Sequence, residues 1–219
     1  MSGQHNNLLS ELLRPKKLTD LMLPDNDIIR LQKMIITGNV SNLLFYGSPG
    51  RRKTSAARIL LCEMKRTLGA DTYELNGSQV SSNKQMEKQI TDIAQSRTLF
   101  LKPKIFLIDE AECLPKRIQH SMRHIVENSS ATCRFILTAN NYNRIIPEIH
   151  SRFMSLNFDL AIRKTNKIID SLRLQIPAKL TELGITFDLD RVHQILQIHF
   201  PDMRAVINKI EYEFRNNQI

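Results

Sequence analysis

The sequence predicts an α/β fold in which a parallel sheet flanked by helices is followed by a small all-helical domain. Short apolar runs alternate with helical patterns along the first 159 residues, and this order favours a parallel sheet with helices on both faces. From about Leu160 the β-type runs stop and only helical patterns remain. We therefore expect two domains, residues 1–159 and residues 160–219.

Four apolar runs predict the strands, at residues 42–46, 71–75, 104–108 and 134–138. A helix expected from about Ser82 opens with a Ser82/Gln85 capping-box spacing, and a second helix follows Pro115. Each has an apolar stripe, formed by Met86, Ile90, Ile93 and Ala94 in the first and by Ile118, Met122, Ile125 and Val126 in the second. Stripes of this period are core faces.

Three further stripes predict the helices of the second domain. They consist of Ile168, Ile169 and Leu172, then of Val192, Ile195 and Leu196, and then of Val206, Ile207, Ile210 and Phe214. Pro177, Gly184 and Pro201 are turn cues that we expect to separate these helices.

Composition indicates a folded protein with a basic surface. The chain is 42% hydrophobic and carries a formal charge of +9, which attracts polyanions, most commonly nucleic acid. Its cysteines, Cys62, Cys113 and Cys133, form no C-x-x-C pair, so they suggest neither a zinc ribbon nor a disulfide framework. No run of about 18 apolar residues occurs, so we expect an intracellular, cytoplasmic protein without membrane contact.

The stretch GSPGRRKTS after the first strand run nearly matches the phosphate-binding loop G-x-x-x-x-G-K-[ST]. Such a loop directs backbone N–H groups and a helix N-terminus at phosphate. Lys53 would reach the β and γ phosphates of ATP, and the Thr54 hydroxyl would bind Mg²⁺. The nucleotide-binding residues expected from this loop are Gly47, Ser48, Pro49, Gly50, Arg51, Arg52, Lys53, Thr54 and Ser55.

Polar residues end two later strand runs. KIFLIDEAE ends in Asp109 and Glu110, and two adjacent carboxylates at a strand tip are poorly explained by packing. In an ATPase Asp109 would hold Mg²⁺, and Glu110 would orient or deprotonate the attacking water. Asn140 ends RFILTANN and would lie beside Asp109, where its amide can hold the water or the γ-phosphate.

Taken in order, these motifs resemble a clamp-loader ATPase of the AAA+ superfamily of P-loop NTPases. The set is LRPKKLTDL (13–21), GSPGRRKTS, IFLIDEAE, FILTANN, EIHSRF (148–153) and FPDMR (200–204), and it spans nearly the whole chain. It is similar to replication factor C small subunits, and more closely to the large clamp-loader subunit of T-even-type bacteriophages. A viral protein of this kind would act in the host cytoplasm.

The resemblance implies further roles. Lys53 and Thr54 correspond to Walker A, Asp109 and Glu110 to Walker B, and Asn140 to sensor 1. Arg152 corresponds to an arginine finger that reaches the ATP of a neighbouring subunit, a task suited to a permanently charged, planar guanidinium. Arg204 corresponds to the sensor 2 arginine of the helical lid. Arg14 and Pro15 correspond to a segment near the base.

The implied partners are other clamp-loader subunits in a hetero-oligomeric ring or spiral, a sliding clamp and primer-template DNA. Helix N-termini and basic side chains suit the duplex backbone. The DNA-binding candidates are Ser82, Lys84, Lys88, Gln119 and Arg123. Gln119 and Arg123 are expected on a polar helix face, where they would join DNA contact to the ATP site. The alternative is that these residues form only a solvated polar face.

Arg52 departs from the pattern, because the loop consensus has glycine there. A side chain at that position would clash with the ligand or force an unfavourable φ costing about 1–2 kcal/mol, so we expect nucleotide affinity to be weakened or absent. The resemblance also implies a collar domain after the lid, and since we expect none within these 219 residues, the chain is expected to be either a fragment or a weakly assembling subunit.

Three hypotheses follow. The chain is an ATP-driven subunit that opens and loads the clamp, or a nucleotide-silent scaffold that binds DNA or clamp and supplies Arg152 in trans, or another AAA+ DNA machine. The carboxylates after the strand and the FPDMR segment favour the first, and GRRKT favours the second. A branch-migration helicase or an initiator accounts less well for LRPKKLTDL and HSRF together.

Overall fold

The computed structural model describes residues 14–21, 23–79, 83–96, 102–159 and 165–215. Within them five strands form one parallel sheet of order β2-β3-β4-β1-β5. The strands are β1 (Leu43–Tyr46), β2 (Asp71–Asn76), β3 (Lys104–Asp109), β4 (Cys133–Ala139) and β5 (Met154–Asn157). The α/β fold with a parallel sheet is therefore confirmed, and the four predicted strands are present.

The strand β5 was not predicted. Its sequence, MSLN, has no continuous apolar run, and only Leu156 is fully buried. It forms because its backbone pairs with β1, with Leu43 opposite Met154 and Leu44 opposite Ser155. Pairing at the edge of a sheet thus outweighs a weak local signal.

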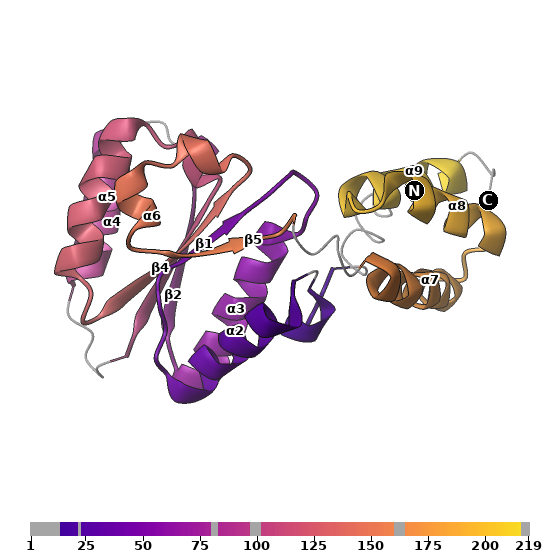
Figure 1. The fold of residues 1–219 in the computed structure, drawn as a ribbon, viewed down its shortest axis with the longest axis horizontal. Helices are drawn as coiled ribbons and strands as arrows, with labels where there is room; N and C mark the ends of the chain where they lie inside the picture. Colours follow the sequence, from indigo (N-terminus) through magenta and orange to yellow (C-terminus); the bar gives the residue numbers. More distant parts are fainter. Residues whose placement is uncertain (1–13, 22, 80–82, 97–101, 160–164, 216–219) are drawn as a thin grey trace.

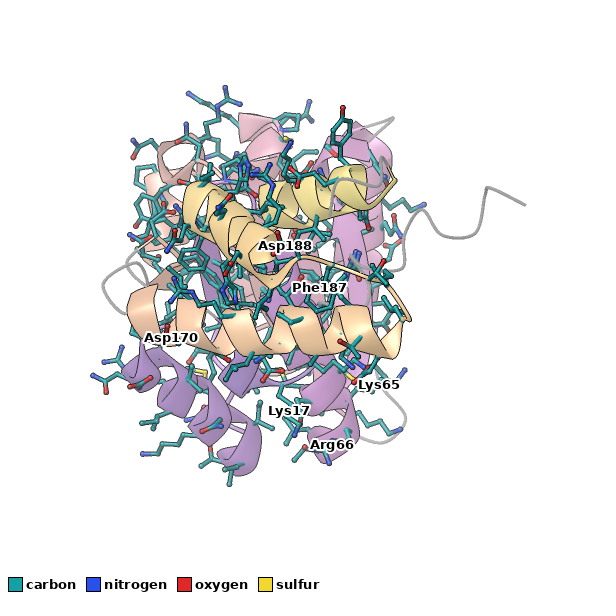
Figure 2. The ribbon with its side chains drawn as sticks, turned by 90° about the vertical axis from the view of Figure 1, so that its right-hand side faces the viewer. Lys17, Lys65, Arg66, Asp170, Phe187 and Asp188 are labelled. Carbon is teal, nitrogen blue, oxygen red and sulfur yellow. The ribbon has the colours of Figure 1, made fainter. Side chains whose placement is uncertain are left out.

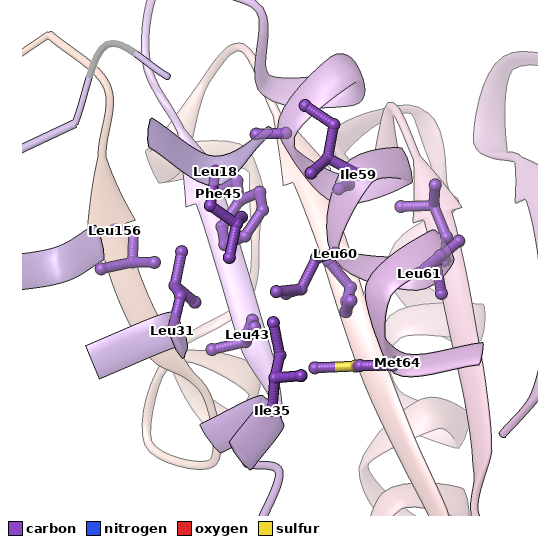
Figure 3. Close-up of a cluster of buried hydrophobic side chains, with 14 of the residues drawn as sticks. Leu18, Leu31, Ile35, Leu43, Phe45, Ile59, Leu60, Leu61, Met64 and Leu156 are labelled. Carbon is purple, nitrogen blue, oxygen red and sulfur yellow. The ribbon is translucent and has the colours of Figure 1, made fainter. Parts of the chain in front are cut away.

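Helices cover both faces of the sheet (Figure 1). The helices of this domain are α2 (Asp25–Thr37), α3 (Lys53–Leu68), α4 (Asn83–Gln95), α5 (Lys116–Asn128) and α6 (Pro147–His150), with short 3₁₀ turns η1 (Leu18–Asp20), η2 (Gly77–Gln79), η3 (Ala111–Cys113) and η4 (Tyr142–Arg144). On one face α2 and α3 pack against Leu43, Phe45 and Leu156 (Figure 3). On the other face α4, α5 and α6 pack against Phe106, Phe135 and Leu137.

The two predicted stripes of the first domain are core faces where their side chains are described. Ile90, Ala94, Ile118 and Met122 are all buried in the second of these clusters. The side chains of Ser82, Gln85 and Met86 lie outside the described residues, so the predicted capping box stays a prediction.

In the described residues 165–215 all regular secondary structure is helical. The helices are α7 (Thr165–Glu182), α8 (Leu189–His199) and α9 (Met203–Arg215), and they share a separate cluster formed by residues such as Leu172, Val192 and Val206. Figure 2 looks onto this domain and shows Phe187 and Asp188 in the connection that leads into α8. The boundary at 159/160 stays a prediction, because residues 160–164 lie outside the described part.

The expectation that Pro177 separates two helices is wrong. Pro177 lies inside α7. The apolar stripe of Leu172, Ile176 and Leu180 continues through it and is buried. Burial of this stripe outweighs the roughly 3 kcal/mol that proline costs inside a helix. Gly184 and Pro201 do lie between helices, as predicted.

No helix of the described part combines the length and the apolar character that a membrane span requires.

One buried carboxylate ties α8 to α9. Glu213 is only 1% exposed and accepts a hydrogen bond from Arg191 Nε at 2.7 Å, while Lys209 Nζ lies 3.1 Å from it. The hydrogen bond from Arg191 lowers the pKa of Glu213 from 4.5 to about 2. The charged form is therefore favoured by folding, and this stability is present above pH 4.5 and lost as the pH falls towards 2.

We expect Glu213→Gln to lower the free energy of unfolding at pH 7 by about 1.5–3 kcal/mol, the range for hydrogen bonds to charged groups. It should also flatten the acid dependence of stability between pH 4.5 and 2, measured by denaturant unfolding at a series of pH values. Glu182→Gln is the matched control, because Glu182 is 62% exposed and pairs only with Lys179 at the surface. Equal pH profiles for the unaltered and Glu213→Gln proteins would contradict the prediction.

Candidate functional site

The carboxyl ends of β1, β3 and β4 meet at one cavity, at the end of the sheet that faces the helical domain (Figure 1). The cavity has a volume of about 220 Å³ and is lined by both domains. Predicted site residues on its wall are Arg14, Pro15, Pro49, Gly50, Arg52, Lys53, Thr54, Ser55, Asp109, Glu110, Asn140 and Arg204. Thr138, Met203, Ile207 and Asn208 also line it and were not predicted.

Lys53 is the buried cation of this cavity. It begins α3, directly after the loop, and is 6% exposed. Its Nζ donates to Gly47 O at 2.8 Å, to Ser48 O at 2.9 Å and to Asn140 Oδ1 at 2.8 Å. These three bonds use every N–H of the ammonium, so Lys53 must give up one of them to bind a phosphate. Burial lowers the pKa of Lys53, and the carboxylates of Glu112, Asp159 and Asp109 oppose that shift.

Asp109, the last residue of β3, links the first turn of α3 to the neighbouring strand β4. The Thr54 hydroxyl, in the first turn of α3, donates to Asp109 Oδ1 at 2.8 Å, and the Thr138 hydroxyl of β4 donates to the same oxygen. Thr138 Oγ1 in turn accepts from the backbone N–H of Glu110 at 3.1 Å. A hydroxyl and a carboxylate side by side are oxygen ligands of the kind that Mg²⁺ prefers.

Glu110 has a strained backbone, with φ at 53° in the left-handed region. Strain of this kind costs about 1–3 kcal/mol and is kept where the surroundings impose it. Gly77, after β2, is part of those surroundings: a Cβ there would lie 2.6 Å from Glu110 O. Only glycine therefore allows this close approach of the two backbones.

We expect Gly77→Ala to displace Glu110, to destabilise the fold by about 1–3 kcal/mol and to lower any nucleotide hydrolysis. Thermal unfolding and phosphate release measure the two effects. Gly69→Ala is the control for hydrolysis: the φ of Gly69, 64°, makes alanine costly for the backbone, but a Cβ there meets nothing within 4 Å and so displaces no site residue. The prediction fails if both variants hydrolyse nucleotide at the same rate.

The two arginines of the loop have different surroundings. Arg51 Nε lies 3.2 Å from Asp159 Oδ1, and the Asp159 carboxylate also accepts from Ser48 N at 3.0 Å. Arg52, in contrast, lines the cavity and precedes α3 with φ at 63°. The expected unfavourable φ at Arg52 is thus present.

The Arg52 side chain is poorly satisfied in its position. Its Nη2 is buried and makes no hydrogen bond. Burial lowers the pKa of the guanidinium to about 10, and the nearby Asp20 carboxylate opposes that shift. A guanidinium with an unbonded N–H group on the cavity wall suits an anionic ligand electrostatically, but the same side chain also takes up room in the cavity.

The helical domain meets the loop at Gly50. Asp202 Oδ1 accepts from Arg204 N at 3.0 Å and from Ala205 N at 3.1 Å, which caps α9. A Cβ on Gly50, whose φ is 76°, would lie only 1.9 Å from that oxygen. This contact brings Arg204, in the first turn of α9, to the cavity wall.

Arg152 lies away from this cavity, two residues beyond α6. It donates to Glu127 through Nε at 2.9 Å and also through Nη2. Its Nη1 donates to Glu148 O at 2.8 Å and to Ser151 Oγ at 2.9 Å. A residue that acts on a neighbouring subunit is expected outside its own cavity, so this position is compatible with the predicted role.

The expectation that Gln119 lies on a polar face of its helix is wrong. Gln119 is 1% exposed, donates to Leu114 O at 3.0 Å and accepts from Ile146 N at 3.0 Å. Its amide satisfies backbone groups next to α5, which is why a polar side chain is buried there. In this conformation it is not accessible to DNA.

The other DNA-binding candidates stay predictions. Lys88 and Arg123 are described, Lys88 on the exposed face of α4 and Arg123 partly exposed on α5. Ser82 and the side chain of Lys84 lie outside the described residues.

Several site residues escaped the sequence analysis. Thr138 and Glu127 are ordinary strand and helix residues by sequence, and only their contacts with Asp109 and Arg152 give them a place in the site. Asp202 belongs to the FPDMR segment, but only its contact with Gly50 gives it a role. Glu112, which accepts from Asn140 N at 2.8 Å, was signalled only by its position in IDEAE.

Comparison with known proteins gives consistent relatives. The profile of the family described as "ATPase family associated with various cellular activities (AAA)" matches residues 43–160. The chain is 30% identical over 217 residues to the replication factor C small subunit of Thermoplasma acidophilum, covering 96% of this chain and 65% of that protein. It is 28% identical over 211 residues to replication factor C subunit 4 of Caenorhabditis elegans, covering 90% of this chain and 60% of the relative. The chain thus spans less than two thirds of the length of these relatives.

Solved structures share the fold. The Aeropyrum pernix ORC1 protein in complex with DNA has a TM-score of 0.64 at 18% identity, covering 94% of this chain and 63% of the other. A RuvB variant from Thermotoga maritima has a TM-score of 0.59 at 16% identity, covering 92% and 73%. The resemblance to replication factor C small subunits is confirmed by these comparisons, whereas the closer resemblance to a phage subunit stays a prediction.

Proposed function

The chain belongs to the ATPase family associated with various cellular activities (AAA), and we propose that it is an ATP-driven subunit of a sliding-clamp loader in DNA replication. ATP binding would close a spiral of subunits that opens the clamp and holds primer-template DNA, and hydrolysis would release both. The observation that carries this proposal is the convergence of Lys53, Thr54, Asp109, Asn140 and Arg204 on one cavity.

The residues of the cavity fit a magnesium nucleotide. Lys53 and Arg204 provide positive charge for the phosphates, and Thr54 with Asp109 provides oxygen ligands for the metal. A bound magnesium ion would neutralise charge on the phosphates. Glu110 would orient or deprotonate the attacking water, and Asn140, 2.8 Å from Lys53 Nζ, would help to position it.

Replication, rather than another process on DNA, is supported by the sequence relatives. The relatives of about 30% identity are replication factor C subunits, whereas RuvB and ORC1 share the fold at 16–18% identity. The basic charge of +9 suits a DNA partner. The partners proposed with this role are neighbouring loader subunits, a sliding clamp and primer-template DNA, in the cytoplasm.

The proposal is tested by the rate of ATP hydrolysis of the assembled loader with saturating primer-template DNA and clamp. An ATP-driven subunit predicts stimulation by both together. A rate that neither ligand changes, in an assembly that does bind them, would contradict the motor role.

Arg52 favours a second candidate, a nucleotide-silent scaffold that binds DNA or clamp and offers Arg152 to a neighbour. Its side chain on the cavity wall opposes ligand entry, and its left-handed φ strains the loop that would hold the ligand. The two candidates differ in whether the unaltered chain binds nucleotide at all.

We expect Arg52→Gly to tighten nucleotide binding by about 5- to 100-fold, since relief of an overfilled site is worth about 1–3 kcal/mol and exceeds the loss of one cation. Calorimetric titration with Mg-ATP measures the effect. Arg51→Gly is the matched control, because Arg51 pairs with Asp159 and does not line the cavity. Equal or weaker binding by Arg52→Gly would show that Arg52 does not obstruct the site.

A further inference from the structure

Arg152 is held within its own subunit by nearly all of its donors. A guanidinium has five N–H groups, and four of those of Arg152 are engaged, two with Glu127, one with Glu148 O and one with Ser151 Oγ. Among the described residues the fifth N–H has no hydrogen-bond partner. An arginine that stabilises a transferring phosphoryl group acts best through two parallel donors and away from a competing carboxylate.

The Glu127 carboxylate has a second arginine beside it. Arg123 lies one helical turn earlier on α5, and its Nε is 3.6 Å from Glu127 Oε1, the oxygen that also accepts from Arg152. This Nε is buried and makes no hydrogen bond. Arg123 is therefore positioned to take over the carboxylate, with a displacement of less than 1 Å, whenever Arg152 leaves it.

The side chains of the two arginines differ in how far they are exposed to solvent. The side chain of Arg152 is 26% exposed, and that of Arg123 is 43% exposed. Glu127 is itself partly exposed, so its bond to Arg152 is of the weak surface kind and opens at modest cost. The hydrogen bond from Arg152 lowers the pKa of Glu127, so the carboxylate is charged in this pair, and Arg123 lies close enough to interact with that charge.

We infer that Glu127 is a positioning residue that restrains Arg152 within its own subunit and releases it by exchanging it for Arg123. The inference rests on the proposed role of Arg152 in trans. In the free chain the Arg152–Glu127 pair keeps the finger from binding stray anions. When a neighbour presents a phosphate, Arg152 turns outward while Arg123 neutralises Glu127.

The first test uses the free, full-length chain and needs no nucleotide. Hydrogen exchange at the Arg152 Nε–H is followed by nitrogen-15 NMR, with the signal assigned from its loss in Arg152→Lys. In the unaltered protein we expect exchange slower than at Arg30, whose side chain is 64% exposed. Glu127→Gln should speed it by about two- to five-fold, the range for surface ion pairs, whereas Arg123→Gln should leave it equal or slower.

Faster hydrogen exchange in Glu127→Gln, together with unchanged or slower hydrogen exchange in Arg123→Gln, is the signature of the proposed swap of the two arginines on Glu127. If Arg123→Gln speeds exchange at Arg152 as much as Glu127→Gln does, the three residues act as one structural unit and the inference is wrong. Exchange in the unaltered protein as fast as at Arg30 would also overturn it, since Arg152 would then not be restrained.

The second test uses mixed assemblies in which the variant chain only donates its arginine to a neighbour with an intact site. A Glu127→Gln donor should raise the neighbour's hydrolysis rate by about two- to five-fold, and an Arg123→Gln donor should lower it. A lower rate with Glu127→Gln would mean that Glu127 aids the finger instead of restraining it. An Arg152→Ala donor that supports the full rate would refute the trans role. If only the swap of Arg152 for Arg123 on Glu127 is disproved, the proposals on nucleotide binding and on the trans role of Arg152 are unaffected.

Discussion

Replacing Glu110 with glutamine is expected to lower ATP hydrolysis by the assembled loader by about 10²- to 10⁴-fold, the contribution of a positioned general base. Glu110 follows β3, lines the cavity and is held in a strained backbone conformation beside Gly77. Glutamine keeps the size of the side chain and removes its ability to accept a proton. Nucleotide binding should therefore persist while turnover stops, which single-turnover phosphate release and equilibrium binding measure separately.

Glu112→Gln is the matched control for this change. Glu112 accepts from Asn140 N, and an amide oxygen can accept the same bond. Its effect on hydrolysis should be less than about ten-fold, because a neutral hydrogen bond is worth about 0.5–1.5 kcal/mol. Equal losses in Glu110→Gln and Glu112→Gln would assign the wrong carboxylate to catalysis.

Replacing Lys53 with alanine is expected to weaken nucleotide binding by about 30- to 5,000-fold. Truncating one member of a buried, hydrogen-bonded charge pair costs about 2–5 kcal/mol, and each 1.4 kcal/mol is ten-fold in affinity. Lys53 is the buried ammonium of the cavity, and its three bonds to the loop and to Asn140 show how closely oxygen atoms surround it.

The stability of the Lys53→Ala protein must be measured beside its affinity. The change leaves Gly47 O, Ser48 O and Asn140 Oδ1 without their shared donor, so the loop itself can rearrange. Lys53→Met keeps most of the side-chain volume and serves as a control for packing. Nucleotide affinity that survives in both variants would place the phosphates elsewhere.

Much of the fold could be predicted because it depends on period and order. The stripes containing Ile90 and Ile118 are buried as predicted, and the four apolar runs are strands. The meeting of Lys53, Asp109 and Asn140 follows from the same logic, since the carboxyl ends of parallel strands share one edge of a sheet. These features need only local sequence and the topology of the sheet.

What could not be predicted depends on partners that are distant in sequence. The strand β5 exists because β1 pairs with it, and Gln119 is buried because Ile146 N and Leu114 O need partners. Glu127 becomes relevant to the site only because it binds Arg152, which is 25 residues away in the sequence. No periodic pattern marks such contacts, because each is a single meeting of two side chains or of a side chain and a backbone group.

The most direct test of the central claim, that the loop after β1 is a nucleotide site, is equilibrium binding of a fluorescent ATP analogue with Mg²⁺ to the unaltered chain. Binding that Lys53→Ala removes is the predicted result, with tighter binding in Arg52→Gly. Absence of binding in the unaltered chain and in Arg52→Gly alike would contradict the claim. Binding only after glycine is restored would assign the loss to Arg52 and leave the chain as a scaffold.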